Sequence, residues 1–275
     1  MKSIDEKSQS LFLNLRNLKS VVVAFSGGVD STFLLWMAVQ ALGKENVLAA
    51  TAVSPSLASS EFNRARDLAK LIGAEWEAVK TDEMEISGYK QNGPDRCMYC
   101  KGELYSKLKE LADKRGFENV VDGTNADDVR GYRPGMKALK ELNIPCPLKD
   151  AELMKEEIRT LSKKVGLPTW NKPAKACLAS RIPYGEEITI ERLKRVEEAE
   201  GILLDLGFEQ LRVRDHYPIA RIEIDTQDIP KLLAEDICLN INSALKKIGY
   251  KFVTLDLAGF HSGSMNALIE GDKND

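Results

Sequence analysis

The sequence predicts an α/β protein with an open parallel sheet of about five strands, helices on both faces of that sheet, and a smaller α+β domain at the C-terminal end. Three observations support this fold class. Apolar runs of strand length alternate with helical patterns over the first 165 residues. The run at 20–25 is dominated by β-branched residues, as is typical of a strand buried on both faces. Prolines then interrupt the pattern at 166–189, where we expect a linker.

The predicted elements follow in a regular order. The N-terminal domain, 1–165, is expected to contain strands at 20–25, 47–53, 75–79, 120–121 and 144–148, with helices at 30–42, 59–72, 151–165 and in the charged stretch that ends near 115. The C-terminal domain, 190–275, is expected to contain helices at 190–206 and 228–248 and strands at 210–214, 219–225 and 251–258. A domain of this size lies within the usual range.

Composition narrows the classes of function. The chain has 42 acidic and 39 basic residues, so no overall positive field attracts nucleic acid or an anionic membrane. The N-terminal segment lacks the apolar region of a secretory signal, and no apolar stretch approaches the roughly 18 residues that cross a bilayer. Five cysteines, an odd number in a chain long enough to form its own core, favour reduced thiols. We therefore expect a cytoplasmic protein without membrane or bulk nucleic-acid partners.

The turn after the first strand carries a phosphate-binding pattern. It reads Ser26-Gly27-Gly28-Val29-Asp30-Ser31 and leads into a helix, whose first-turn N–H groups and dipole favour an anion. The glycines allow close approach of the backbone, and the serine hydroxyls can donate to phosphate oxygens. A tight turn with a capping residue is the alternative interpretation of the Gly-Gly pair. The whole string between a strand and a helix favours the phosphate site.

The same string resembles the PP-loop of the ATP pyrophosphatase superfamily, which includes NAD synthetase and GMP synthetase. The resemblance implies adenylylation of a substrate oxygen by ATP, with release of pyrophosphate and participation of Mg²⁺. The segment 123–128 looks like the superfamily's fourth-strand loop, although an acidic surface turn also explains its carboxylates. The ATP-binding residues implied are Ala24, Ser26, Gly28, Asp30, Ser31, Ser54, Gly123, Thr124, Asp127 and Asp128, and Asp30 is also a catalytic candidate.

The cysteines suggest a metal or redox site. Cys97 and Cys100 form a Cys-x-x-Cys pair, and Cys177 lies in the proline-rich segment. On residue types alone, a redox dithiol, part of a zinc site and a 4Fe-4S cluster with one open iron all remain possible. Both histidines lie far along the chain, so a closed zinc site needs a distant ligand. We interpret Cys146 and Cys238 as small buried apolar residues.

The proline-rich segment supplies a second resemblance. Residues 172–185 read Lys-Pro-Ala-Lys-Ala-Cys-Leu-Ala-Ser-Arg-Ile-Pro-Tyr-Gly, which closely resembles the signature of the LarE family. These are ATP-dependent sulfurtransferases that act on pyridinium biscarboxylic acid mononucleotide in nickel-pincer nucleotide biosynthesis. The resemblance implies that a carboxylate of the substrate is adenylylated and that sulfur then replaces AMP, which leaves a thiocarboxylate.

Two sulfur sources occur in that family. In one version the cysteine of the signature gives up its own sulfur. In the other, two further cysteines help to bind a 4Fe-4S cluster that carries sulfide. Cys97 and Cys100 are similar to those further cysteines, so the resemblance implies the cluster type, with Cys97, Cys100 and Cys177 as ligands and catalytic residues. Sulfide or a sulfide donor is then an expected partner.

Basic residues of the C-terminal part are candidates for substrate binding. Ser180 and Arg181 lie in the signature segment, and Arg212 and Arg214 have the period-two spacing that places both side chains on one face of a strand. Arginines suit a phosphate and two carboxylates because each guanidinium can bind two oxygens. A solvated edge strand is the alternative.

Other functions fit part of this pattern. Cluster-dependent tRNA thiolation uses the same loop and three cysteines, but the acidic balance and the signature segment weigh against it. An amidating synthetase does not need three cysteines. A non-catalytic nucleotide sensor with a structural metal would bind ATP without forming AMP. For the enzyme we expect a homo-oligomer.

Overall fold

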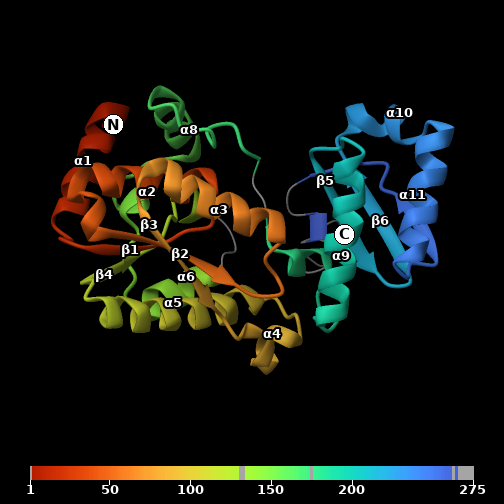
Figure 1. Ribbon diagram of the computed structural model, residues 1–275, viewed down its shortest axis with the longest axis horizontal. Helices are drawn as coiled ribbons and strands as arrows, with labels where there is room; N and C mark the ends of the chain where they lie inside the picture. Colours follow the sequence, from red (N-terminus) through yellow and green to blue (C-terminus); the bar gives the residue numbers. More distant parts are fainter. Residues whose placement is uncertain (1, 130–133, 174–175, 262–263, 266–275) are drawn as a thin grey trace, which may run out of the picture. The chain divides into compact units, whose positions relative to one another are not determined.

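The computed structural model describes the chain except for residues 1, 130–133, 174–175, 262–263 and 266–275. The chain forms two compact units (Figure 1). The first unit consists of Met1–Glu83 and Cys97–Lys175, and the second consists of Met84–Arg96 and Ala176–Asp275. A segment from the first half of the sequence therefore belongs to the second unit. The division at 1–165, 166–189 and 190–275 remains a prediction about folding domains.

The first unit contains a parallel sheet of four strands in the order β3-β2-β1-β4. The strands are β1 (Val21–Ala24), β2 (Val47–Val53), β3 (Glu75–Lys80) and β4 (Asn119–Val121). Val21 of β1 lies opposite Val47 of β2 and Asn119 of β4. Because successive strand residues point to opposite faces, Val21 and Val23 enter one core and Val22 enters another. The predicted fold class is thus confirmed.

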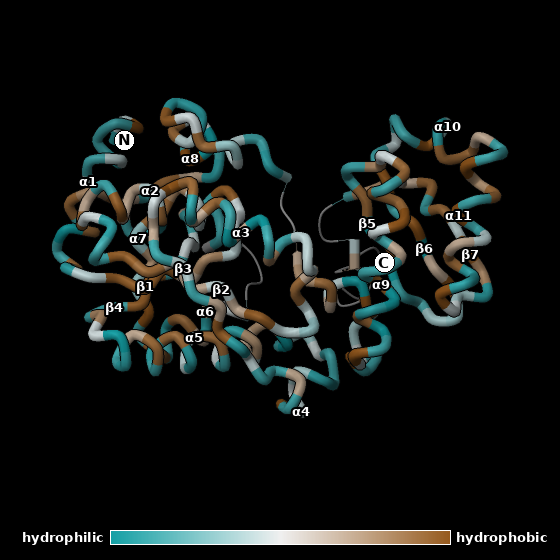
Figure 2. Tube along the Cα trace, viewed as in Figure 1, coloured by the Kyte–Doolittle hydropathy of each residue, from teal (hydrophilic) through white to brown (hydrophobic). Residues whose placement is uncertain are grey.

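Helices cover both faces of this sheet (Figure 1). Residues of α1 (Ile4–Arg16), α2 (Val29–Leu42), α3 (Ser59–Ile72), α7 (Pro147–Asp150) and α8 (Lys155–Lys164) share the core with Val21 and Val23. Residues of α5 (Arg96–Arg115) and α6 (Gly135–Glu141) share the core with Val22. In Figure 2, α5 is hydrophobic toward the sheet and hydrophilic on its outer side. Helix α1 was missed by the sequence patterns, although a capping box of Ser3 and Glu6 begins it.

The predicted fifth strand at 144–148 is wrong. Residues 144–146 are irregular, and Pro147 begins the short helix α7. Pro145 and Pro147 have no N–H group to donate to a neighbouring strand, which disfavours a central strand here. A backbone hydrogen bond from Asp122 N to Pro145 O, 3.0 Å long, still holds the segment beside the end of β4.

The second unit contains the three-stranded sheet β5-β6-β7, in which β5 and β6 are antiparallel and β6 and β7 are parallel. Its elements are α4 (Ser87–Lys90), α9 (Ile190–Asp205), β5 (Leu211–His216), β6 (Ile219–Ile224), α10 (Ile229–Leu232), α11 (Glu235–Lys247) and β7 (Phe252–Leu255). Helices α9 and α11 share a core with the sheet. Helix α4 was not predicted, and the elements from α9 onward occur in the predicted order, except that one predicted helix is interrupted.

The helix predicted at 228–248 is interrupted. The chain leaves the helical conformation at Ala234, where ψ is 133°, so that α10 and α11 are separate helices. Glu235 and Asp236 then occupy the first turn of α11, where the helix dipole favours negative charge. None of the helices in the described part of the chain has both the length and the apolar character needed to cross a membrane.

Candidate functional site

The two predicted ATP-binding loops meet at one edge of the parallel sheet. The strand order reverses between β1 and β4, and ligands of open α/β sheets bind beyond the carboxyl ends of the strands at such a point. Gly123, after β4, lies against the first turn of α2: a Cβ atom at Gly123 would be only 3.2 Å from Ser31 N. The fold therefore brings the 26–31 loop and the 123–128 loop side by side.

The phosphate loop requires its first glycine. Gly27 has a φ of +66°, and a Cβ atom there would be 3.3 Å from Ala65 Cα of α3. Gly28 is the N-cap of α2 and has no side chain that could accept from the N–H groups of the first turn. The Oγ atoms of Ser26 and Ser31 lie 3.2 Å apart, and Gly28 N donates to Ser26 Oγ at 3.4 Å. Such a helix start can bind an anion.

Asp30 has one oxygen suited to a cation. Its Oδ2 accepts from Lys155 Nζ at 2.5 Å, whereas its Oδ1 is buried and accepts no hydrogen bond of ordinary geometry from the described residues. Burial raises the pKa of Asp30, the charge of Lys155 lowers it, and the charge of Asp128 raises it further. Two nearby carboxylates, one with an unused buried oxygen, fit a Mg²⁺ ligand set. Sequence patterns did not indicate Lys155 as a residue of this site.

Asp122 organises the end of β4 and was also missed. Its carboxylate accepts from the backbone N of Thr124 at 2.7 Å, from the Thr124 hydroxyl and from the hydroxyl of Tyr105. Burial alone would raise the pKa of Asp122, but Lys101 and these hydrogen bonds outweigh burial and lower it. The Thr124 hydroxyl therefore holds the loop to Asp122. Its contact with ATP remains a prediction. The position of Asp122 directly before Gly123 was the available signal.

Asp127 and Asp128 contribute to the conformation of their own loop. Asp127 Oδ2 accepts from Lys155 N at 2.8 Å, and Asp128 Oδ2 accepts from Asn125 N at 3.1 Å. Asn125 Oδ1 in turn accepts from the backbone N atoms of both aspartates. These bonds agree with the turn interpretation, and they do not test nucleotide or metal binding.

Ser54 lies directly after β2 in a chain of hydroxyl groups. Its Oγ is 2.9 Å from Ser56 Oγ, which lies 2.9 Å from the buried Glu83 carboxylate; the Thr81 hydroxyl donates to the other oxygen of Glu83 at 2.7 Å. Ala24, at the end of β1, is half-buried. Both residues lie at the carboxyl ends of neighbouring strands, as a nucleotide-binding role requires.

A second lysine contacts the phosphate loop. Lys172 Nζ donates to Gly27 O at 3.1 Å and to Glu61 Oε2 at 2.7 Å, and its side chain is only 9% exposed. Lys172 begins the quoted signature segment, but no sequence pattern indicated that it would contact this loop. Ala174 and Lys175 of that segment lie outside the described residues. The loop thus has Lys155 and Lys172 as neighbouring cations.

In the second unit, Ser180 and Arg181 hold the backbone of Cys177. Cys177 O accepts from Ser180 N at 3.0 Å, from Ser180 Oγ at 2.8 Å and from Arg181 Nη1 at 2.9 Å. The Arg181 guanidinium also binds both carboxylate oxygens of Glu200, at 2.8 and 2.9 Å. These two candidate substrate-binding residues therefore shape the cysteine loop, and their contact with substrate remains a prediction.

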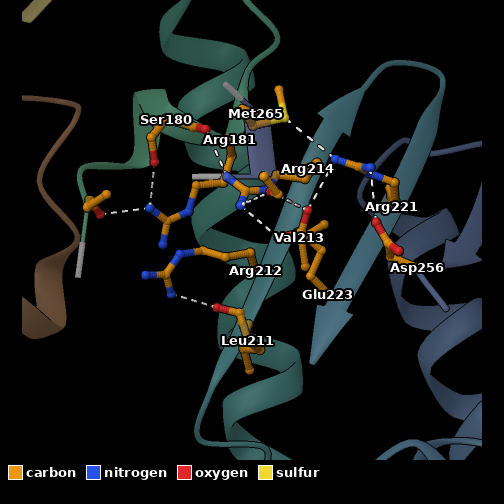
Figure 3. Close-up of polar contacts among 12 residues, drawn as sticks. Ser180, Arg181, Leu211, Arg212, Val213, Arg214, Arg221, Glu223, Asp256 and Met265 are labelled. Atoms are coloured by element: carbon orange, nitrogen blue, oxygen red, sulfur yellow. Dashed lines mark hydrogen bonds and ion pairs between the residues drawn. The ribbon is translucent and has the colours of Figure 1, made fainter. Parts of the chain in front are cut away.

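Arg212 and Arg214 share one face of the β5–β6 hairpin with Glu223 (Figure 3). Arg214 donates to Glu223 Oε2 at 2.7 Å and to Ser180 O at 3.0 Å, while its buried Nε has no hydrogen-bond partner among the described residues. Burial lowers the pKa of Arg212 to about 10, and the charges of Arg181 and Arg214 add to this effect. Closely spaced buried cations and an unused donor fit an anionic ligand.

The cysteines differ in accessibility. Cys97 is exposed and Cys100 half-buried, one turn apart near the start of α5 in the first unit, and Cys177 is exposed in the second. None of the three forms a disulfide, so their sulfur atoms are available to ligate a metal. Within the described part of the chain, no group of three His, Cys, Asp or Glu side chains is placed to hold a metal.

The remaining two cysteines have different environments. Cys146 is buried as expected, and burial raises the pKa of its thiol to about 11. The prediction that Cys238 is buried is wrong, because the buried residues of α11 begin only at Ile241, one turn later.

Comparison with known proteins gives full-length and partial matches. The family model for NAD synthase matches residues 7–115. An uncharacterized protein of Synechocystis sp. is 42% identical over 266 residues, which are 97% of this chain and 99% of the relative. A pyridinium-3,5-bisthiocarboxylic acid mononucleotide synthase of Lactiplantibacillus plantarum is 39% identical over 266 residues, which are 97% of this chain and 96% of the relative. A GMP synthase of Aeropyrum pernix is 31% identical over 202 residues, 66% of this chain and 38% of that enzyme.

Proposed function

Since the chain belongs to the LarE family within the PP-loop superfamily, we propose that it is an ATP-dependent sulfurtransferase acting on pyridinium-3,5-biscarboxylic acid mononucleotide. The observation that carries the proposal is the likeness, across both units, to an enzyme named for the bisthiocarboxylic acid product. The enzyme would adenylylate a substrate carboxylate, release pyrophosphate, and then exchange AMP for sulfur to give a thiocarboxylate.

The first unit would activate the carboxylate. The N–H groups at the start of α2 and the hydroxyls of Ser26 and Ser31 would bind the phosphates of ATP. Lys155 and Lys172 would add positive charge where the leaving pyrophosphate develops negative charge. Asp30, through its buried Oδ1, would hold Mg²⁺, which neutralises phosphate charge when it is bound. A carboxylate oxygen of the substrate then bonds to the α-phosphorus, and the bond to the β-phosphate oxygen breaks.

The second unit would bind the anionic substrate. The pyridinium mononucleotide carries a phosphate and two carboxylates, and Arg212 and Arg214 offer the complementary charge on one strand face. Burial, together with the charges of Arg181 and Arg214, lowers the pKa of Arg212, and a bound anion would stabilise its charged form, which supports this role. Arg181 and Ser180 would fix the Cys177 backbone beside these arginines.

We further propose that Cys97, Cys100 and Cys177 ligate a 4Fe-4S cluster. Support comes from the exposure of Cys97 and Cys177 and from the buried, high-pKa thiol of Cys146, which is unsuited to ligation. When bound, such a cluster supplies a replaceable sulfide at the iron that lacks a protein ligand. The other source, the sulfur of Cys177 itself, would leave dehydroalanine at this position after one turnover.

Anaerobic purification with iron and acid-labile sulfide analysis tests the cluster, and product analysis tests the reaction. We expect AMP and pyrophosphate to form only with ATP and the pyridinium substrate, and Cys177 to remain intact after several turnovers. Cys97→Ser should lose iron, whereas the matched control Cys238→Ser, at an exposed cysteine of α11, should keep it. Protein without iron, or with stoichiometric zinc, contradicts the cluster. AMP formation that is independent of the pyridinium substrate contradicts the proposed reaction.

A further inference from the structure

The segment Met84–Arg96 belongs to the second unit and ends at the residue directly before Cys97. It contacts residues more than ninety positions later in the chain. Gly185 N donates to Asn92 O at 3.0 Å, and Ile188 N donates to Lys90 O at 2.9 Å. The segment therefore pairs with the stretch that follows Cys177, within a single compact unit.

Asn92 makes the central contacts of this pairing. Its side chain is fully buried, and its Nδ2 donates to Ile182 O at 3.2 Å and to Pro183 O at 2.7 Å. Its φ of +53° is in the left-handed region, which asparagine adopts more readily than most residues. Both amide hydrogens are thus used to hold the Cys177 stretch.

Arg96 continues the contact toward Cys177. It is 5% exposed, and its Nη1 donates to Asn92 Oδ1 at 2.6 Å and to Ala179 O at 3.0 Å. Its guanidinium also lies over the Tyr184 ring, 5.6 Å from the centroid. Ala179 belongs to the one-turn helix at 178–181 that Cys177 caps. A buried guanidinium with several fixed partners holds a defined geometry, because each lost bond leaves a buried donor unsatisfied.

We propose that Asn92 and Arg96 are positioning residues that bring the Cys177 loop to the start of α5. Cys97 follows Arg96 in the chain, and consecutive Cα atoms are about 3.8 Å apart. The bond from Arg96 to Ala179 therefore limits the separation between Cys97 and Cys177 before any metal binds. This inference rests on the proposed function only in its purpose, which is to keep the three ligands of a cluster within reach of one another.

A thiol cross-linking experiment on the metal-free full chain tests the proposal. Cys238→Ser serves as the background for all variants, to remove an unrelated exposed thiol. The probe is a short bismaleimide at low protein concentration, and peptide mass spectrometry measures the rate at which Cys177 becomes linked to Cys97 or Cys100. The background protein should link rapidly, and Arg96→Met should link about tenfold more slowly because the effective concentration of one thiol near the other falls.

Two further variants keep the test decisive. Arg96→Lys retains the charge and the aliphatic stem but not the two-bond geometry, so its linking rate should lie between those of the background protein and Arg96→Met. This variant tests the proposal even if the methionine variant folds poorly. Arg195→Met removes an arginine of similar burial, 8% exposed, that pairs with Asp215 in the same unit, and it should link at the background rate. Equal rates for Arg96→Met and the background overturn the proposal, as does equal slowing by Arg195→Met or a background protein that does not link.

Iron analysis separates this inference from the proposed cluster. Slow linking of Arg96→Met in a protein that never binds iron would support positioning and contradict the cluster. Unchanged linking of Arg96→Met in a protein whose wild type binds iron would overturn positioning and leave the cluster standing.

Discussion

Replacing Arg212 with methionine tests whether the second unit is built to bind an anion at the expense of its own stability. Arg212 is 8% exposed and lies on the same strand face as Arg214. Its Nη1 donates to Leu211 O at 2.7 Å, and its guanidinium lies 4.9 Å from the Phe260 ring centroid. Methionine retains an unbranched apolar side chain but removes the charge.

The expected change in stability follows from opposing contributions. A pKa lowered from 12.5 to about 10 means that the charged form is disfavoured by about 3 kcal/mol, since one pKa unit is about 1.4 kcal/mol. Removing the charge recovers this amount but loses about 1 kcal/mol of hydrogen bonding to Leu211 and about 1 kcal/mol of attraction to Phe260. The net expectation is stabilisation of the ligand-free protein by about 1 kcal/mol, or roughly 2 °C in Tm.

The same change should weaken anion binding. A hydrogen bond to a charged group contributes about 1.5 to 3 kcal/mol, so the Kd for inorganic phosphate should rise about 10-fold to 100-fold. Thermal unfolding in increasing phosphate, compared with sodium chloride at equal ionic strength, measures both effects. We expect the variant to start at a higher Tm and to gain less from phosphate. A lower Tm without phosphate, or an unchanged response to it, would refute the reasoning.

A matched arginine gives the opposite expectation. Although burial opposes it, the carboxylates of Asp215 and Glu186 raise the pKa of Arg192. Arg192→Met leaves the fully buried Asp215 with one partner fewer, so unfolding should become easier by about 3 kcal/mol, with the response to phosphate unchanged.

Three further predictions concern the first unit. Burial raises the pKa of Asp30 above its usual value of 3.8, so the metal-free protein should lose stability as the pH rises through this raised pKa. Mg²⁺ affinity should fall as the pH drops through the same pKa. Asp30→Asn should remove both pH dependences in thermal unfolding, and their persistence would contradict the assignment. Lys172→Met should slow pyrophosphate release about tenfold through the loss of charge beside the phosphate loop. The control Lys164→Met, at a lysine with a 70% exposed side chain, should release pyrophosphate at the wild-type rate. Equal rates for the two variants would exclude a role for Lys172. With a pKa of about 11, Cys146 is about 0.1% thiolate at pH 8, so iodoacetamide should label the other four cysteines first, and early labelling of Cys146 would show that its thiol is not buried.

Local sequence signals predicted the parallel sheet and the position of the phosphate loop. The β-branched run of β1, the Gly-Gly turn and the start of α2 are adjacent in the chain, so each restricts the next. Local chemistry also explains the error at 144–148, since the absence of N–H groups at Pro145 and Pro147 argued against a strand there.

Contacts between distant residues could not be predicted in this way. Lys155 and Lys172 reach the phosphate loop across more than 120 positions, and a lysine that contacts the loop has the same local sequence as a solvated one. Cys146 and Cys238 both have apolar neighbours, and only tertiary packing distinguishes the buried thiol from the exposed one. The association of Asn92 with Ile182 and Pro183 likewise depends on backbone carbonyls, which carry no sequence signal.

The path of the chain has a consequence for dissecting this protein. Because it enters the second unit at 84, returns to the first at 97 and enters the second again at 176, neither unit is a continuous piece of polypeptide. A fragment that stops at 175 would retain Asn92 but lack the carbonyls of Ile182 and Pro183 that its amide group binds. Expression of the first unit alone would therefore need a short linker in place of residues 84–96. A genetic fusion or circular permutation should keep that segment together with the C-terminal hundred residues.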